Sequence, residues 1–197
     1  MRQLITAATL LVAASVVVAE DKRLLWGDTH LHTNNSFDAI TIGNKSIGPA
    51  EAYRYARGLP VVHPYHGARV QIGTPLDFLV VSDHAEFLGL VRHVYEQGAP
   101  TEGLGPIDIV YAWLSSLAIK IGIDTRWGAL LFGSRLPDSE DPRVAGERIA
   151  EQGFSLGGIQ ANPDISRQVW SEITAAADAY NDPGDFTALI GWEWSSN

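Results

Sequence analysis

Residues 76–82, Leu-Asp-Phe-Leu-Val-Val-Ser, form a nearly continuous apolar run, and the polar pair Asp83-His84 follows it directly. A run of this kind is typical of a strand buried on both faces of a parallel sheet. Residues 186–194 (FTALIGWEW) have the same character and predict a second buried strand. Ligands of parallel α/β sheets bind at the carboxyl ends of the strands. A site is therefore expected beside the polar residues at the ends of these runs.

A third strand is predicted upstream, over residues 24–32 (LLWGDTHLH), with a polar loop after it at residues 33–36. Alternate residues of a strand share one side, so Asp28, His30 and His32 can converge on one ion. The alternative is a pair of partly exposed histidines on a sheet face.

The strand over residues 76–82 adds two further candidates at its end. His84 could supply a third imidazole to a metal site. Asp83 suits a role in orienting a ligand imidazole through its ring N–H. Taken alone, Ser82-Asp83-His84 is also compatible with an ordinary capped turn, because Ser and Asp are common turn residues.

Helices are expected between the strands, at residues 49–57, 107–123, 143–151 and from 163 to about 180. The second and third belong to a helical insertion over about residues 98–158. Residues 61–72 favour a hairpin or an extended excursion. Strands that alternate with helices in this way predict an α/β fold with parallel strands.

The first 19 residues have the three regions of a secretory signal peptide: Arg2, the apolar run Leu4–Val18, and small residues before Glu20. Cleavage after Ala19 removes 19 of the 197 residues, which leaves 178, and the loss of Arg2 changes the net charge from −9 to −10. A retained anchor helix is the alternative. No other apolar run approaches membrane-spanning length. We therefore expect a soluble periplasmic or secreted protein, in an oligomeric state that the sequence leaves open.

The amino-acid composition excludes several kinds of catalytic group, metal ligand and binding partner. The chain has no Cys, which excludes thiolate nucleophiles, Fe–S clusters and Cys-type zinc sites, so any metal must bind to His, Asp or Glu. With three Lys and an acidic net charge, the chain lacks the basic surface that a nucleic-acid partner requires.

Other ionisable and aromatic residues carry weaker signals. Glu193, between two Trp residues, either faces solvent near a sheet edge or pairs with a cation or metal, because an unpaired carboxylate is costly to bury. Asp38 is most simply a solvated turn residue. His63 and His66 are interpreted as loop residues. Packing, in the core or in the insertion, is the expected role of three tryptophans, Trp113, Trp127 and Trp170.

Four motifs, in order, resemble the PHP superfamily of metal-dependent phosphoesterases, named for polymerase and histidinol phosphatase. They are similar above all to its secreted branch catalogued as domain of unknown function 3604, and they cover most of residues 25–197. The motifs are WGDTHLHTNNSFDA, PAEAYRYARG, PLDFLVVSDHAEFLG and PGDFTALIGWEWSS. Ser82 stands where the superfamily usually has Thr, which keeps the hydroxyl.

The resemblance implies five metal ligands, with Asp28 as an adjacent site residue: His30, His32, Asp38, His84 and Glu193. It also implies a distorted (β/α)7 barrel with two or three divalent ions, for which Zn, Mn and Fe suit the donor atoms. The implied reaction is attack of a metal-bound water on a small phosphate ester. Two alternatives remain: an amidohydrolase-type barrel, which also opens with HxH, and a metal-binding fragment without catalysis.

The superfamily draws further His and Asp ligands from later strands, whereas this chain has no His after His93. Only three barrel strands are predicted, and a barrel of this type needs about seven or eight. We therefore expect the chain to be the N-terminal part of an incomplete barrel and to be a poor catalyst on its own.

Overall fold

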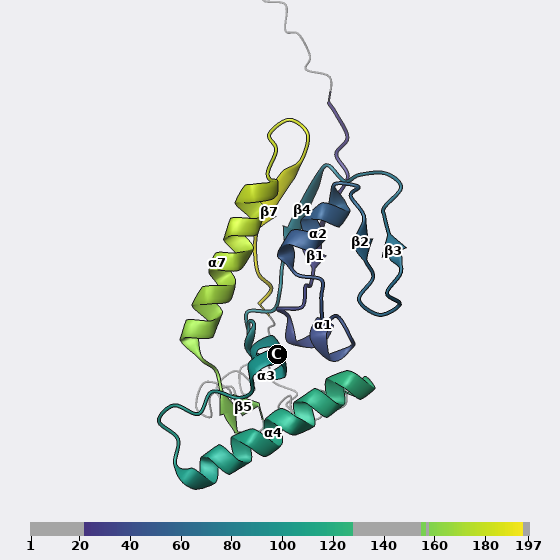
Figure 1. Ribbon diagram of the computed structural model, residues 1–197. Helices are drawn as coiled ribbons and strands as arrows, with labels where there is room; N and C mark the ends of the chain where they lie inside the picture. The colour runs from purple at the N-terminus through teal and green to yellow at the C-terminus, as the bar shows by residue number, and fades with distance from the viewer. Residues whose placement is uncertain (1–21, 128–154, 157, 195–197) are drawn as a thin grey trace, which may run out of the picture.

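A three-stranded parallel sheet forms the centre of the fold (Figure 1). The computed structural model describes residues 22–127, 155–156 and 158–194. The strands lie in the order β1 (Gly27–Leu31), β4 (Phe78–Val81) and β7 (Thr187–Ile190), and β4 pairs with both neighbours in parallel. The predicted α/β class with parallel strands is confirmed. Within the described ranges the strands form no closed barrel, so the (β/α)7 barrel is not confirmed.

Two helices cover one face of this sheet: α2 (Pro49–Ala56) and α7 (Pro163–Tyr180). Both begin as predicted, with Pro in the first turn, where its missing N–H costs nothing. The side chain of Asn162 accepts a hydrogen bond from the backbone N–H of Asp164 at 2.9 Å and caps α7. The two helices and the sheet share a buried cluster: Ala52, Tyr53, Ala56, Leu79, Val81, Ala177 and Phe186.

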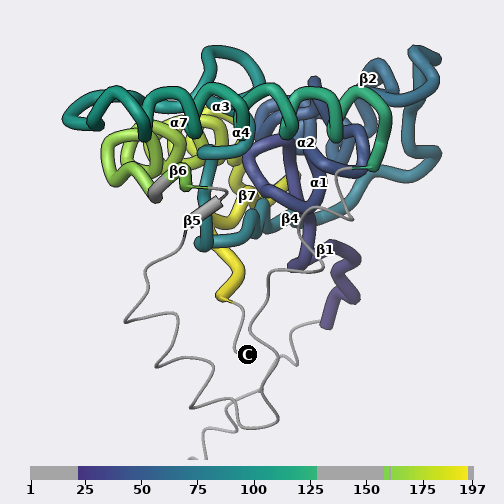
Figure 2. Tube along the Cα trace, turned by 90° about the horizontal axis from the view of Figure 1, so that it is seen from below, coloured from purple at the N-terminus to yellow at the C-terminus, as the bar shows by residue number. Residues whose placement is uncertain are grey.

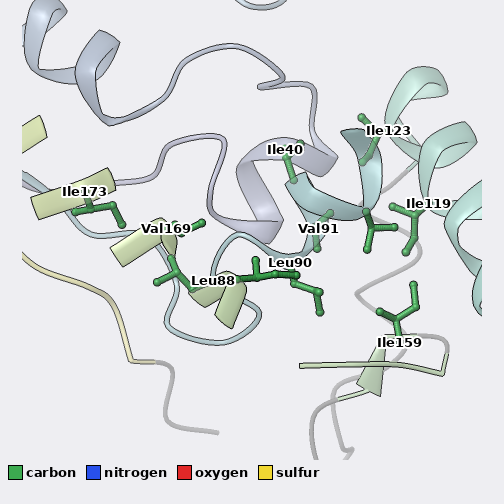
Figure 3. Close-up of a cluster of buried hydrophobic side chains, with 11 residues drawn as sticks. Ile40, Leu88, Leu90, Val91, Ile119, Ile123, Ile159, Val169 and Ile173 are labelled. Atoms are coloured by element: carbon green, nitrogen blue, oxygen red, sulfur yellow. The ribbon is translucent and has the colours of Figure 1, made fainter. Parts of the chain in front are cut away.

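A second core lies beyond the carboxyl ends of the strands (Figure 3). It is formed by the helices α1 (Phe37–Thr41), α3 (Leu90–Gln97), α4 (Pro106–Thr125) and the first part of α7. Its buried residues include Ile40, Leu90, Val91, Val94, Ile119, Ile123, Val169 and Ile173. Because α7 contributes to both cores, it links the sheet to the helical layer that carries α4.

Two short antiparallel hairpins complete the described elements. The first pairs β2 (Val61–Val62) with β3 (Arg69–Val70), which confirms the predicted hairpin. The second pairs β5 (Ser155–Leu156) with β6 (Ile159–Gln160). The predicted signal peptide and the predicted helix at 143–151 lie outside the described residues.

Two expectations about burial, and one about the length of apolar runs, are wrong. The strand β7 is not buried, because Leu189 and Ile190 are 41% and 47% exposed. Trp113 and Trp127 do not pack in a core, since both are more than 60% exposed; only Trp170 is partly buried, against Trp192. The expectation that no apolar run after residue 19 approaches membrane-spanning length is also wrong, because among the described residues α4 is long and apolar enough to cross a membrane by length and composition alone. An apolar stretch can therefore be recognised in a sequence without its burial being known.

Candidate metal centre

The carboxyl ends of the three parallel strands bring the predicted ligands together. His30 lies in β1 and His32 directly after it, while Asp83 and His84 follow β4. Beyond β7 the chain continues alongside β4: the Glu193 N–H donates to the Asp83 carbonyl at 3.0 Å, and the Ala85 N–H donates to the Glu193 carbonyl at 2.9 Å. This backbone pairing fixes Glu193 beside His84.

One group of ligand-type side chains consists of His30, His32 and Glu193. Glu193 Oε2 lies 3.1 Å from His30 Nε2 and 2.7 Å from His32 Nε2. Asp28 holds the backbone of this group, because its carboxylate accepts a hydrogen bond from the His30 N–H at 2.8 Å. The predicted convergence of the two histidines therefore occurs, and the carboxylate facing them comes from the other end of the described chain.

A second group consists of His32, Asp38 and His84. Asp38 Oδ2 lies 2.9 Å from His32 Nδ1 and 3.8 Å from His84 Nε2. Asp38 is not a loop residue, as the sequence suggests, because it lies in the first turn of the short helix α1. There the Ser36 hydroxyl donates to its Oδ1 at 2.6 Å, which holds the other oxygen toward the imidazoles.

His32 belongs to both groups and dominates their electrostatics. Its hydrogen-bond contact with Asp38 raises the pKa of His32 above its usual 6.5, against the opposing effect of burial. Burial alone would raise the pKa of Asp38, but the contacts with His32 and Ser36 outweigh it and hold this pKa below its usual range. For Glu193, likewise, the nearby histidines outweigh burial and lower the pKa. Both carboxylates are therefore anionic at neutral pH.

The donor geometry fits a cation. His32 Nε2 is buried and makes no hydrogen bond, although Glu193 Oε2 lies only 2.7 Å from it. Two such atoms, close together but not aligned for hydrogen bonding, suit a shared positive charge. In each group the potential ligand atoms all lie within 4.8 Å of one another. Nitrogen and oxygen donors without thiolate suit Zn, Mn or Fe.

Asp83 supports the centre in a way that the sequence does not predict. Its buried carboxylate contacts no imidazole at hydrogen-bond distance within the described chain; it accepts hydrogen bonds from the N–H and the hydroxyl of Thr33, the latter at 2.7 Å. Burial raises the pKa of Asp83, while the Thr33 hydrogen bonds oppose the shift. Residues 33–36, expected as a polar loop, are all buried.

Two further residues, which the sequence does not single out, adjoin His84. The Phe37 ring stacks on the His84 imidazole, with centroids 4.6 Å apart. Glu86 is 9% exposed in its side chain, and its Oε2 lies 3.7 Å from His84 Nδ1. The only sequence signal for Glu86 is its position two residues after His84.

His63 and His66 belong to neither group that the described residues form. They lie in the turn between β2 and β3, as their interpretation as loop residues expects. His63 Nδ1 accepts hydrogen bonds from the backbone N–H groups of Tyr65 and His66, at 3.2 and 3.3 Å. That nitrogen is therefore engaged locally.

Comparison with known proteins gives one match. No curated protein and no solved structure matches the chain. A family model described as a protein of unknown function, DUF3604, matches residues 19–197, which is nearly the whole sequence. The chain that places these histidines and carboxylates at one edge of its sheet thus belongs to the DUF3604 family.

Proposed function

We propose that this protein is a metal-dependent hydrolase of the PHP type, and that it acts on a small phosphate ester. The observation that carries the proposal is the pair of overlapping ligand groups around His32. Five side chains of metal-ligand type converge there from the ends of three strands and from α1: His30, His32, Asp38, His84 and Glu193.

Each residue has a distinct role in this proposal. His30, His32 and Glu193 would hold one divalent ion, and His32, Asp38 and His84 form the second candidate group. A divalent ion supplies a Lewis acid that lowers the pKa of water and balances the negative charge of a phosphoryl group. Several ions, two or three as the PHP resemblance implies, would strengthen both effects.

The remaining site residues position the ligands. Asp28 fixes the His30 backbone, and Asp83 ties the segment after β1 to the end of β4 through Thr33. Asp83 is fully buried and both of its oxygens are occupied, so we assign it to positioning instead of proton transfer. Removing a residue that orients metal ligands without touching the metal typically weakens metal binding by about 10- to 100-fold.

Metal binding and hydrolysis are tested separately. The purified protein is stripped with a chelator and titrated with Mn, Zn or Fe, with calorimetry and elemental analysis as readouts. Stoichiometric binding that is lost in His32→Ala but kept in His66→Ala is the expected result. His66 is the matched control because it is a histidine outside both groups.

Hydrolysis is then assayed on the metal-loaded protein with p-nitrophenyl phosphate and, in parallel, with amide and lactone substrates. Metal-dependent turnover of the phosphate ester alone supports the proposal. Turnover of amides or lactones alone would favour the amidohydrolase alternative. Because the chain is expected to be a poor catalyst on its own, the assay is run at high protein concentration against a chelated control. Stoichiometric binding with no turnover above that control would leave a metal-binding protein and refute the hydrolase assignment.

A further inference from the structure

The helix α4 has two apolar faces, and only one of them packs against the described protein. The inner face is buried and includes Ala112, Ser116, Ile119 and Ile123. The opposite face carries large side chains that are 43% to 71% exposed, which we call the outer stripe: Ile107, Val110, Leu114, Leu117 and Ile121. Figure 1 shows α4 at the lower edge of the molecule, with the other described helices and the sheet on one side of it, and Figure 2, seen from below, shows α4 lying across them.

The spacing of the outer stripe suits another helix. Its residues follow one another at intervals of three, four, three and four positions. This is the heptad spacing of a helix that packs side by side with a second helix, knobs into holes. A helix that covers only the core of its own domain needs a single apolar face. The stripe therefore indicates a helical partner.

The exposed area is large enough for a stable interface. Tyr111 and Trp113, each 63% exposed, flank the outer stripe. If each of the seven side chains exposes about 100 Å², half of what a large side chain buries, the face presents on the order of 700 Å². A standard protein interface buries about 800 Å² on each partner. Patches this large on soluble proteins mark interaction sites.

A lipid surface fits this helix less well than a protein does. Lys120 is the single basic residue within α4, which also contains Asp108 and Asp124, and the whole chain has a net charge of −9. Helices that lie on membranes usually carry several Lys or Arg residues on their polar face.

The helix is also held to the body of the protein. Asp124 lies 2.8 Å from the Tyr95 hydroxyl and 3.1 Å from Lys45 Nζ, and the Ser116 hydroxyl accepts a hydrogen bond from the Ala99 N–H at 2.9 Å. To cross a membrane, α4 would have to break these contacts and expose the core residues Ile119 and Ile123.

We propose that the outer stripe packs against the same stripe of a second copy of this chain, so that the protein is a homodimer joined by a pair of α4 helices. A second copy supplies the heptad surface, the aromatic flanks and the area that the stripe requires. The interface uses none of the metal-ligand residues, so the proposal stands independently of the hydrolase assignment.

The first test is the oligomeric state of the purified full chain, measured by sedimentation equilibrium. We expect the unmodified protein to be a dimer and the double variant Leu114→Glu, Leu117→Glu to be a monomer with an unchanged circular dichroism spectrum. The control is Val62→Glu, which places the same charge on another exposed apolar residue, 59% exposed on β2, and should stay dimeric.

A second test does not depend on the charged variant remaining folded. The chain has no Cys, so Leu114→Cys introduces a single thiol into the middle of the outer stripe. Mild oxidation should convert this variant to a disulfide-linked dimer that is visible without reductant, whereas Val62→Cys should stay monomeric on the gel.

Three outcomes would overturn the proposal. The first is a monomer at concentrations up to about 100 μM with no Leu114→Cys cross-link. The second is a monomer that floats with phosphatidylglycerol vesicles and loses this binding in the double variant, which would assign the stripe to lipid. The third is a wild-type protein that is monomeric together with a double variant that does not fold. That result would show that the stripe is covered within one chain.

Discussion

Asp83 accepts two hydrogen bonds from Thr33, one from the backbone N–H and one from the side-chain hydroxyl. Thr33 directly follows His32, and Asp83 directly precedes His84. The contact therefore locks together the two strand ends that carry ligand imidazoles. It gives the centre a rigid base that does not itself need to touch a metal.

Replacing Asp83 should weaken both the fold and the metal centre. In Asp83→Asn an amide N–H₂ group faces the Thr33 donors, so one buried donor loses its acceptor, at a cost of about 1–3 kcal/mol. We expect a lower free energy of unfolding in urea and about 10- to 100-fold weaker metal binding. Asp185→Asn, an exposed change of the same kind, serves as the control. An unchanged unfolding curve for Asp83→Asn would contradict this role.

The sharing of His32 predicts a hierarchy among the histidines. His32→Ala removes a ligand from both groups, whereas His30→Ala leaves His32, Asp38 and His84 intact. The number of metal ions per chain, measured by equilibrium dialysis and elemental analysis, should fall further in His32→Ala than in His30→Ala. Equal losses in the two variants would mean that the second group does not bind metal independently.

Substitutions at two glycines that share a left-handed backbone conformation can separate the cost of backbone strain from the cost of steric crowding. Gly89 and Gly67 have φ values of 72° and 64°, but a Cβ at Gly89 would collide with Val169, whereas none of the surrounding atoms lies within 4 Å of a Cβ at Gly67. Gly67→Ala should cost about 1–2 kcal/mol from the backbone alone. Gly89→Ala should cost about 1–3 kcal/mol more, because the core between α3 and α7 must shift. Urea denaturation measures both, and equal costs would refute the close packing.

Tyr53 should make the protein sensitive to alkali. Burial raises the pKa of Tyr53 to about 12, and its hydroxyl donates to the Leu189 carbonyl at 2.9 Å. In the unfolded chain Tyr53 loses its proton near pH 10, whereas in the folded protein it keeps the proton up to about pH 12. The contribution of Tyr53 to the free energy of unfolding is therefore complete below about pH 10 and is lost as the pH rises toward 12. The loss should approach about 3 kcal/mol.

Tyr53→Phe isolates this effect from the titration of other groups. The variant lacks the hydroxyl and should show a smaller fall in unfolding free energy between pH 9 and pH 11.5 than the unmodified protein. Parallel pH profiles for the two proteins would contradict the assignment of the alkaline sensitivity to Tyr53.

Local patterns were sufficient to predict most of the regular elements. The apolar run at 76–82 predicts β4 at the centre of a parallel sheet, and Asn162-Pro163 predicts the start of α7, because strand burial and helix capping depend on neighbouring residues. The convergence of His30 with His32 also follows from the alternation of one strand.

Features that depend on contacts between residues far apart in the sequence do not follow from local patterns. The distance between His30 and Glu193 is set by β4, which lies between β1 and β7, and the resemblance to a family is the only sequence signal that joins the two residues. The local sequence of Asp38 predicts a solvated turn residue, because only the folded chain shows the imidazoles next to it. The same holds for α4, whose two apolar faces look alike until one of them is packed.

The order of the strands has a consequence for biosynthesis. His30 and Glu193 lie near opposite ends of the described chain, and β1, which holds His30, is joined to β7, which precedes Glu193, only through β4. A growing polypeptide therefore exposes its first imidazoles long before the carboxylate that faces them has been synthesised. A complete group of His30, His32 and Glu193 can bind an ion only after β7 has paired with β4, so metal binding by that group would report that this pairing has formed.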